Sequence, residues 1–198
     1  MIFGLFRSGP AASTVALYSA IVSEARHVAF YDGYGVPDTP TARFDMVVLH
    51  LALVVRRLRE DPAAAGLVLP GEGRRKPQSL DERLRELVEY FFEEMDRALR
   101  EMGVGDVAVP KRMKKLAAAW NGRTRAYDAA LAANDRDALA EALARNVLTE
   151  AKTRDGAPAL ADHVLAAAAA LAVQPLDRLL AGHVEWPDPA ALSPGIAP

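Results

Sequence analysis

The side chains with the widest chemical range in this sequence are four histidines, at positions 27, 50, 163 and 183. Glu24 and His27 form a Glu-x-x-His, the unit with which helical di-iron proteins bind their metal. Those proteins need the unit twice, with a carboxylate from each of two further helices, and this sequence holds no second copy. We therefore interpret the match as chance, and we predict no metal site and no cofactor.

His50 stands inside the apolar stretch 46–55, which leaves two interpretations. It is either a core histidine that is hydrogen-bonded to a neighbouring group, or a ligand of a metal or haem. A helical metal site usually shows a second ligand three or four residues further on, and none follows His50 there. The sequence therefore favours a hydrogen-bonded core histidine.

Signatures of catalysis are missing elsewhere in the chain. The absence of cysteine excludes disulfides, thiol nucleophiles, thiolate zinc sites and iron–sulfur ligation by cysteine. The glycines at 103 and 105 follow a predicted helix rather than a strand, and no Gly-Lys-Ser/Thr comes after them, so they fit a helix stop better than a phosphate loop. No Gly-x-Ser-x-Gly elbow occurs. We predict a protein that is not an enzyme, with no catalytic residue and no small-molecule substrate.

A cluster of basic residues is the first feature that points to a partner. It contains no acidic residue and consists of Lys111, Arg112, Lys114, Lys115, Arg123 and Arg125. The cluster creates a local positive field although the formal net charge is −2, and that total gives no reason to expect DNA as a partner. Either these cations pair with the acidic helix that precedes them, or they bind an anionic partner such as RNA, lipid headgroups or an acidic protein surface.

Gly122 is the second such feature, because it falls inside a predicted helix. Glycine there is less favourable than alanine by about 1 kcal/mol, so a compensating gain is expected. Close packing of another helix of the same domain would supply it. A groove that receives a helix of another protein is the alternative.

The elements that position these residues are helical, because apolar residues recur with helical spacing and no long stretch alternates. We predict an all-α, single-domain bundle of six or more helices. Their expected positions are from Ser13 or Thr14 to before Gly33, 41–60, from a capping box at Ser79 to Gly103, from Pro110 through Leu131, from a cap at Asn134 or Asp135 through Val147, from Pro158 to Pro175, and 176–181. Residues 1–12 form a flexible N-terminal segment in this division, 13–181 the helical domain and 182–198 a Pro-rich tail.

The helix at 41–60 should be the buried centre of the bundle, because its middle is apolar on all sides. We expect Leu49, Leu53 and Phe92 to be nearly fully buried. No apolar stretch approaches the roughly 20 residues of a spanning helix. We expect a cytoplasmic protein that is peripheral at the inner face of the membrane. At the N-terminus, the apolar residues of segment 3–7 with its arginine fit a flexible tail better than a membrane contact.

Three stretches together resemble a known family. They are 34–39 running on to Arg43–Met46, Leu49-His50 and Arg56–Leu58; 96–106 followed by 109–115; and Gly122-Arg123 with Tyr127-Asp128. In these residues the chain is similar to the ubiquinol–cytochrome c chaperone family, over roughly 15–150.

The resemblance implies an all-α fold and an assembly chaperone that binds newly made cytochrome b and assists biogenesis of ubiquinol–cytochrome c reductase. It implies no catalysis. We expect a ribosome, beside which the mitochondrial members of the family work, or an anionic membrane surface as a further partner. The alternative is a module that binds such an anionic surface without acting on a client. The candidate partner-binding residues are Arg43, His50, Arg56, Arg57, Lys111, Arg112, Lys114, Lys115, Gly122 and Arg123.

Overall fold

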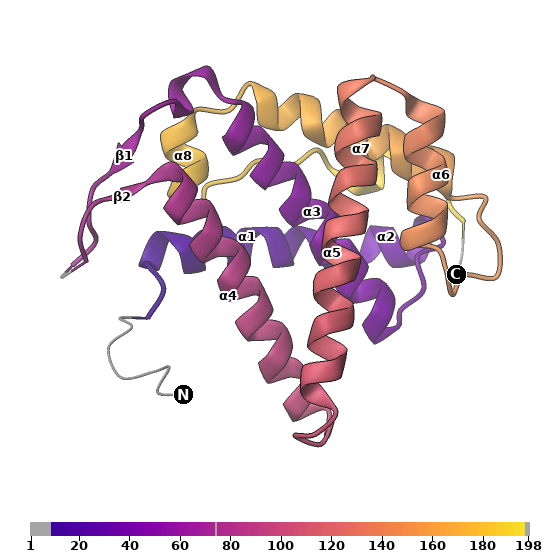
Figure 1. Cartoon of the computed structure of the whole chain (residues 1–198). Helices are drawn as coiled ribbons and strands as arrows, with labels where there is room; N and C mark the ends of the chain where they lie inside the picture. Colours follow the sequence, from indigo (N-terminus) through magenta and orange to yellow (C-terminus); the bar gives the residue numbers. More distant parts are fainter. Residues whose placement is uncertain (1–8, 74, 197–198) are drawn as a thin grey trace.

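Helices make up nearly all regular structure in residues 9–73 and 75–196, the part of the chain that this computed structural model describes (Figure 1). The α-helices are α1 Ala12–Ala25, α2 Val28–Gly33, α3 Pro40–Glu60, α4 Leu80–Glu101, α5 Val109–Ala132, α6 Arg136–Asn146, α7 Ala157–Ala172 and α8 Leu176–Leu180. Two short 3₁₀ helices, η1 Pro62–Ala64 and η2 Pro189–Leu192, and the two-residue strands β1 Val68–Leu69 and β2 Gln78–Ser79 complete the set. The predicted all-α fold is confirmed.

Helix α3 is the centre of the bundle and contacts α1, α5 and α7. Every residue from Phe44 to Val55 is buried, including Leu49 at 0% and Leu53 at 2% exposed, as the apolar stretch predicts. The prediction for Phe92 is wrong, because that ring is only half-buried and Phe91 is fully buried instead. Leu80, Leu84, Leu87 and Phe91 recur at three- or four-residue spacing on one buried face, and Phe92 lies at its edge.

Helix ends follow the predicted local chemistry. The Ser79 hydroxyl accepts from the Glu82 amide while the Glu82 carboxylate accepts from the Ser79 amide, which is the reciprocal capping box. Gly103 ends α4 with φ +79°, and the following Val104 amide donates to the Leu99 carbonyl at 3.0 Å. This is the Schellman arrangement, in which a left-handed residue favours glycine. Asp135 caps α6 by accepting from the Ala138 amide.

The first predicted helix is in fact two helices, α1 and α2, and this corrects the sequence-based expectation. The apolar spacing continues through Ala29, but His27 adopts an extended backbone and its ring accepts from the Ala29 amide at 3.3 Å. A side chain that satisfies a free backbone donor begins a new helix and so interrupts the old one. The change of direction places Phe30 and Tyr34 in the core.

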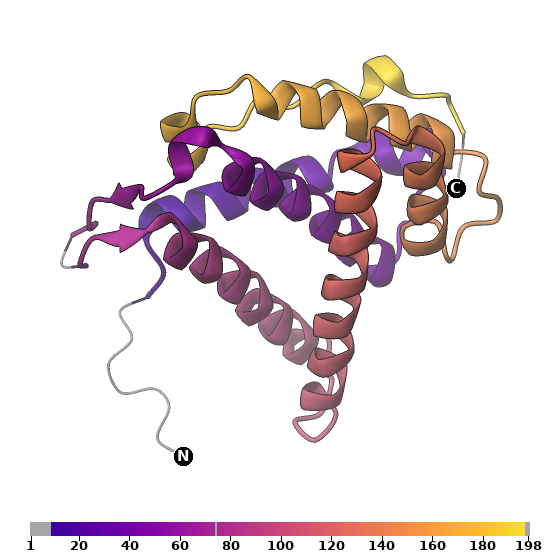
Figure 2. The same ribbon diagram turned by 45° about the horizontal axis from the view of Figure 1, so that its top comes forward.

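The segment after Gly182 packs against the helices (Figure 2). The Tyr34 hydroxyl donates to the Pro189 carbonyl at 2.8 Å, and the Ile196 amide donates to the Gly33 carbonyl at 2.8 Å. Trp186 is half-buried against the core. The segment thereby covers α2 and one side of α7. Phe3, Leu5, Phe6 and Arg7, for which a flexible tail was predicted, lie outside the described residues.

Candidate functional site

Arg57, one of the predicted partner-binding residues, connects α3 to the end of α7. Its guanidinium donates to the Leu171 carbonyl at 2.7 Å, to the Gln174 carbonyl at 3.0 Å and to the Asp61 carboxylate at 2.6 Å. The last carbonyls of a helix have no partner within the helix, so a cation there satisfies them. All three interactions are within the chain, and the side chain is mostly buried.

Arg123 and Arg56 join α5 to α3. Arg123 forms an ion pair with the buried Asp45 at 2.9 Å, and its guanidinium lies 5.7 Å from the centre of the Phe44 ring. Burial raises the pKa of Asp45 to about 7 although Arg123 acts in the opposite direction. Arg56 pairs with Glu60 at 3.0 Å and donates to the Asp128 carbonyl at 3.3 Å. Both arginines therefore hold α5 against α3.

Arg43 remains accessible at the start of α3. Its guanidinium donates to both carboxylate oxygens of Asp38, one of them at 2.9 Å. These hydrogen bonds lower the pKa of Asp38, and about half of each side chain is exposed. Surface pairs of this kind contribute little to stability, so Arg43 is free to exchange Asp38 for another anion.

The predicted basic run lies exposed at the start of α5. In residues 9–73 and 75–196, no acidic group forms an ion pair with Lys111, Arg112, Lys114 or Lys115. At the end of α4 nearest the basic run, Arg97 pairs with Glu94, and Arg100 pairs with Asp96 and with Asp106 of the connection to α5. The sequence left open whether the basic run pairs with the preceding acidic helix. In the described residues it does not.

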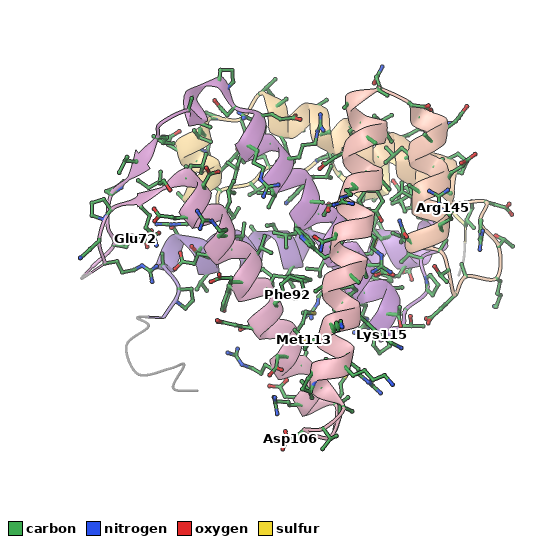
Figure 3. All side chains as sticks on the ribbon, in the orientation of Figure 1. Glu72, Phe92, Asp106, Met113, Lys115 and Arg145 are labelled. Carbon is green, nitrogen blue, oxygen red and sulfur yellow. The ribbon has the colours of Figure 1, made fainter. Side chains whose placement is uncertain are left out.

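Two of these cations, Lys111 and Lys115, belong to a longer exposed stripe on α5. Its members are spaced three or four residues apart and so share one helix face. They are Lys111, Lys115, Ala118, Gly122, Arg125 and Ala129, here called the α5 stripe, and all six are exposed. In Figure 3, Lys115 lies on the side of α5 away from α4, whereas Met113 lies toward α4.

Gly122 is in the middle of the α5 stripe. A Cβ atom added there would meet nothing within 4 Å in the described part of the chain. Close packing inside the domain, the interpretation that the sequence favoured for this glycine, is therefore wrong. The other side of α5 borders an open groove of about 350 Å³ between α3, α4 and α5, and its apolar lining includes Val55, Val88 and Trp120.

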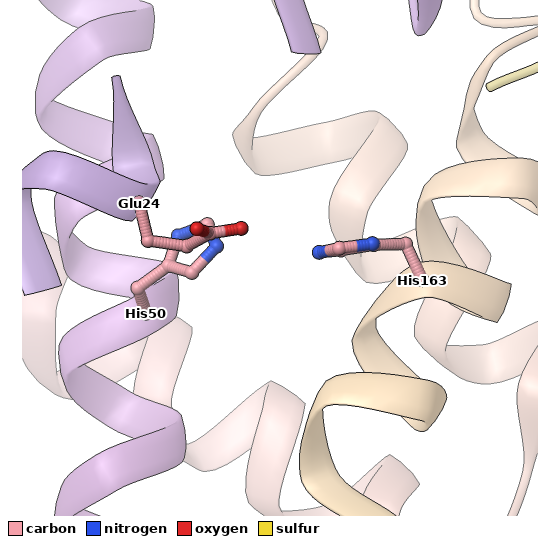
Figure 4. Close-up of side chains that lie close together, drawn as sticks. All are labelled: Glu24, His50 and His163. Atoms are coloured by element: carbon pink, nitrogen blue, oxygen red, sulfur yellow. The ribbon is translucent and has the colours of Figure 1, made fainter. Parts of the chain in front are cut away.

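His50 lies in the interior of the domain, unlike the arginines between the helices and the exposed residues of the α5 stripe. It is 1% exposed, and its Nδ1 lies 2.8 Å from the Met46 carbonyl oxygen, which confirms a hydrogen-bonded core histidine. The same ring faces Glu24 of α1 and His163 of α7, and donor atoms of the three side chains lie within 4.8 Å of one another (Figure 4). We call these three residues the interior cluster.

Burial controls the protonation of the interior cluster. It lowers the pKa of His50 and of His163 to about 4, and it raises the pKa of Glu24 to about 7 with a further contribution from Asp188. Each shift favours the uncharged form, as expected where water is excluded. Sequence reasoning missed this cluster, because its members come from three helices that are far apart in the chain. The only signal was histidine within apolar helices.

Comparisons with known proteins agree with the resemblance. The family model described as ubiquinol-cytochrome C chaperone matches residues 32–186. A crystal structure of the Cbp3 homolog from Brucella abortus superposes with a TM-score of 0.73 at 37% sequence identity, and the match covers 90% of each chain. Among curated proteins, none matches. The family match includes α3, α4, α5 and α7, and with them every predicted partner-binding residue. The chain therefore belongs to the ubiquinol–cytochrome c chaperone family.

Proposed function

We propose that this protein is an assembly chaperone that binds newly made cytochrome b and assists biogenesis of ubiquinol–cytochrome c reductase, without catalysing a reaction. The observation that carries the proposal is the family match over residues 32–186, together with 37% identity to the Cbp3 homolog over 90% of both chains. No helix of the described chain is long and apolar enough to cross a bilayer. We propose that the client binds at a surface of the helical domain.

The α5 stripe is the surface that we propose for the client. Ala118 and Gly122, four residues apart, leave the middle of the stripe without a bulky side chain, which allows the backbone of another helix to approach closely there. Lys111 and Lys115 at one end of the stripe supply charge that is not neutralised by an ion pair with any described residue. A newly made membrane protein offers apolar helices with polar ends, and the stripe has the matching features.

The predicted partner-binding residues divide accordingly. Lys111, Arg112, Lys114, Lys115, Gly122 and Arg43 are available to a partner, and we propose them as direct contacts. Arg56, Arg57 and Arg123 hold α5 and α7 on α3, and His50 lies in the interior. We propose that these four act on client binding only through the position of the helices.

A second candidate function is binding of an anionic surface, a membrane or a ribosome, without a client. The connection between α4 and α5 favours it, because Met102 is 56% and Val107 is 96% exposed beside the basic run. Exposed apolar side chains next to cations are typical of membrane-surface contacts. This function depends on long-range attraction, which salt screens beyond about 10 Å at 0.1 M ionic strength.

Salt dependence separates the two functions. The tagged full-length chain is purified from membranes of its source organism at low and high ionic strength, and cytochrome b is quantified in the eluate. Apolar contact is not weakened by salt, so the proposal expects cytochrome b to remain bound at high salt. Retention of lipid or ribosomes at low salt only, with no cytochrome b at either ionic strength, contradicts it.

A further inference from the structure

The interior cluster brings three potential metal ligands together from three helices. Glu24 comes from α1, His50 from α3 and His163 from α7, and one donor atom of each lies within 4.8 Å of the others. In Figure 4 the His163 ring points toward the Glu24 carboxylate and the His50 ring. Donors on a tetrahedral ion are about 3.3 Å apart, so side-chain shifts of about 1 Å close the cluster.

Two members of the cluster have buried polar atoms without a partner. Within residues 9–73 and 75–196, no group forms a hydrogen bond with Glu24 Oε1 or with either ring nitrogen of His163. His163 is 1% exposed, so water does not reach it freely. A buried polar atom without a partner destabilises a protein by about 1–3 kcal/mol, and native structures avoid such atoms unless something else occupies the site.

His50 is already held in the orientation of a ligand. A carbonyl oxygen can only accept, so the Nδ1 that lies 2.8 Å from the Met46 oxygen carries the proton. The lone pair is then on Nε2. Metal-binding histidines almost always donate their other N–H to a carbonyl or carboxylate, which fixes the tautomer and the ring. In His50 the hydrogen bond from Nδ1 to the Met46 carbonyl is already present without an ion.

We propose that Glu24, His50 and His163 form a binding site for one divalent transition-metal ion, with Zn²⁺ as the ion that the donors fit. Two imidazoles and one carboxylate are a known zinc donor set, in which a water takes the fourth position. Mg²⁺ and Ca²⁺ prefer sites made of oxygen alone. Glu24 supplies negative charge, and Asp188 is near enough to act on both Glu24 and His163.

Such an ion would tie the first, central and seventh helices at one point. The ring of Trp186 lies 5.3 Å from that of His50, so the C-terminal segment covers the same site. Glu24 is only partly buried, which leaves a route for the ion at its side of the cluster. The site is in the interior, apart from the α5 stripe, and the proposal does not depend on the identity of the client.

Metal titration of the full chain tests the site. The protein is stripped with a chelator, titrated with Co²⁺ and followed by its visible d–d absorption. We expect one Co²⁺ per chain in a tetrahedral spectrum, displacement by Zn²⁺, and a higher melting temperature with either ion, because a ligand of the folded state stabilises it.

Three variants decide where the ion binds. Glu24→Gln and His163→Gln remove one donor each and should weaken Co²⁺ binding by at least about tenfold. His183→Gln is the control, because His183 is exposed and outside the cluster, and it should bind as the unmodified chain does. If His163→Gln does not fold, the neutral isostere Glu24→Gln still decides. Absence of binding at micromolar ion, or equal binding by all folded variants, overturns the proposal.

Discussion

The buried ion pair of Asp45 and Arg123 makes a prediction at the scale of single residues. Burial raises the pKa of Asp45 to about 7, whereas an aspartate in an unfolded chain titrates near pH 4. Between these values the folded state holds a proton that the unfolded state has released. The stability contributed by Asp45 is therefore complete below about pH 4 and is lost as the pH rises through about 7.

Asp45→Asn should remove this dependence. Urea unfolding is compared with the unmodified chain at several pH values. A constant offset is expected, because an amide replaces the carboxyl group that contacts Arg123. In addition to this offset, the free energy of unfolding of the unmodified chain should fall relative to that of the variant as the pH rises, by up to roughly 1.4 kcal/mol per pH unit. Asp38→Asn is the control. The lowered pKa of Asp38 predicts that its contribution to stability changes with pH in the opposite direction, and the exposure of its side chain predicts that this change is small. A constant difference between pH 4 and 7 contradicts the assignment for Asp45.

Single residues also show where sequence reasoning ends. The hydrogen-bonded state of His50 could be predicted, because an apolar helix leaves a histidine few partners besides its own backbone. Its proximity to Glu24 and His163 could not, since contacts between distant helices have no local spacing. Phe91 and Phe92 differ only in their angle around α4, and the periodicity did not distinguish the buried ring from the half-buried one.

Arg57 makes a prediction at the scale of elements, because it joins α3 to the end of α7. Arg57→Ala removes the guanidinium donor from the Leu171 and Gln174 carbonyls, of which the Leu171 carbonyl keeps the Gln174 amide. It also removes the cation from Asp61. Hydrogen bonds to charged groups contribute about 1.5–3 kcal/mol, so we expect a clear fall in melting temperature. Client capture per folded molecule should change little, because Arg57 positions the end of α7 and not the α5 stripe. Lower capture at an unchanged melting temperature would show instead that Arg57 contacts the partner.

The α5 stripe predicts the reverse behaviour for charge reversal. Lys111→Glu with Lys115→Glu should leave the melting temperature unchanged or slightly raised, because anions near a helix N-terminus are favoured by its dipole and exposed charges change stability by less than about 0.5 kcal/mol. Co-purification of cytochrome b should fall. The control is Lys152→Glu with Arg154→Glu, the same change in charge at exposed positions between α6 and α7. Equal capture by both double variants excludes the stripe.

Helix boundaries were predictable where a side chain marks them. The serine of the capping box, the glycine after α4 and the proline in the first turn of α5 each have a local physical reason to be there. The break before α2 was not predictable, because a histidine cap at His27 is an uncommon solution and the apolar spacing runs through it. Helix boundaries are therefore predicted better from capping residues than from apolar periodicity alone.

At the scale of the whole molecule, the all-α architecture could be predicted because one helix is apolar on every side and the others on one face. The division of the candidate residues could not. Nothing in the sequence distinguishes Arg57, which holds α7, from Lys115, which is exposed and has no ion pair with any described residue. That difference depends on which carbonyls and carboxylates the fold brings near each cation.

Deletion of the gene in its source organism tests the central claim most directly. Membranes are compared by reduced-minus-oxidised spectra of b- and c-type cytochromes and by ubiquinol–cytochrome c reductase activity. The proposal predicts selective loss of the reductase with its cytochrome b, restored by the unmodified gene and not by the Lys111→Glu, Lys115→Glu form. A reductase that assembles to its normal level without the protein would contradict a role in its biogenesis.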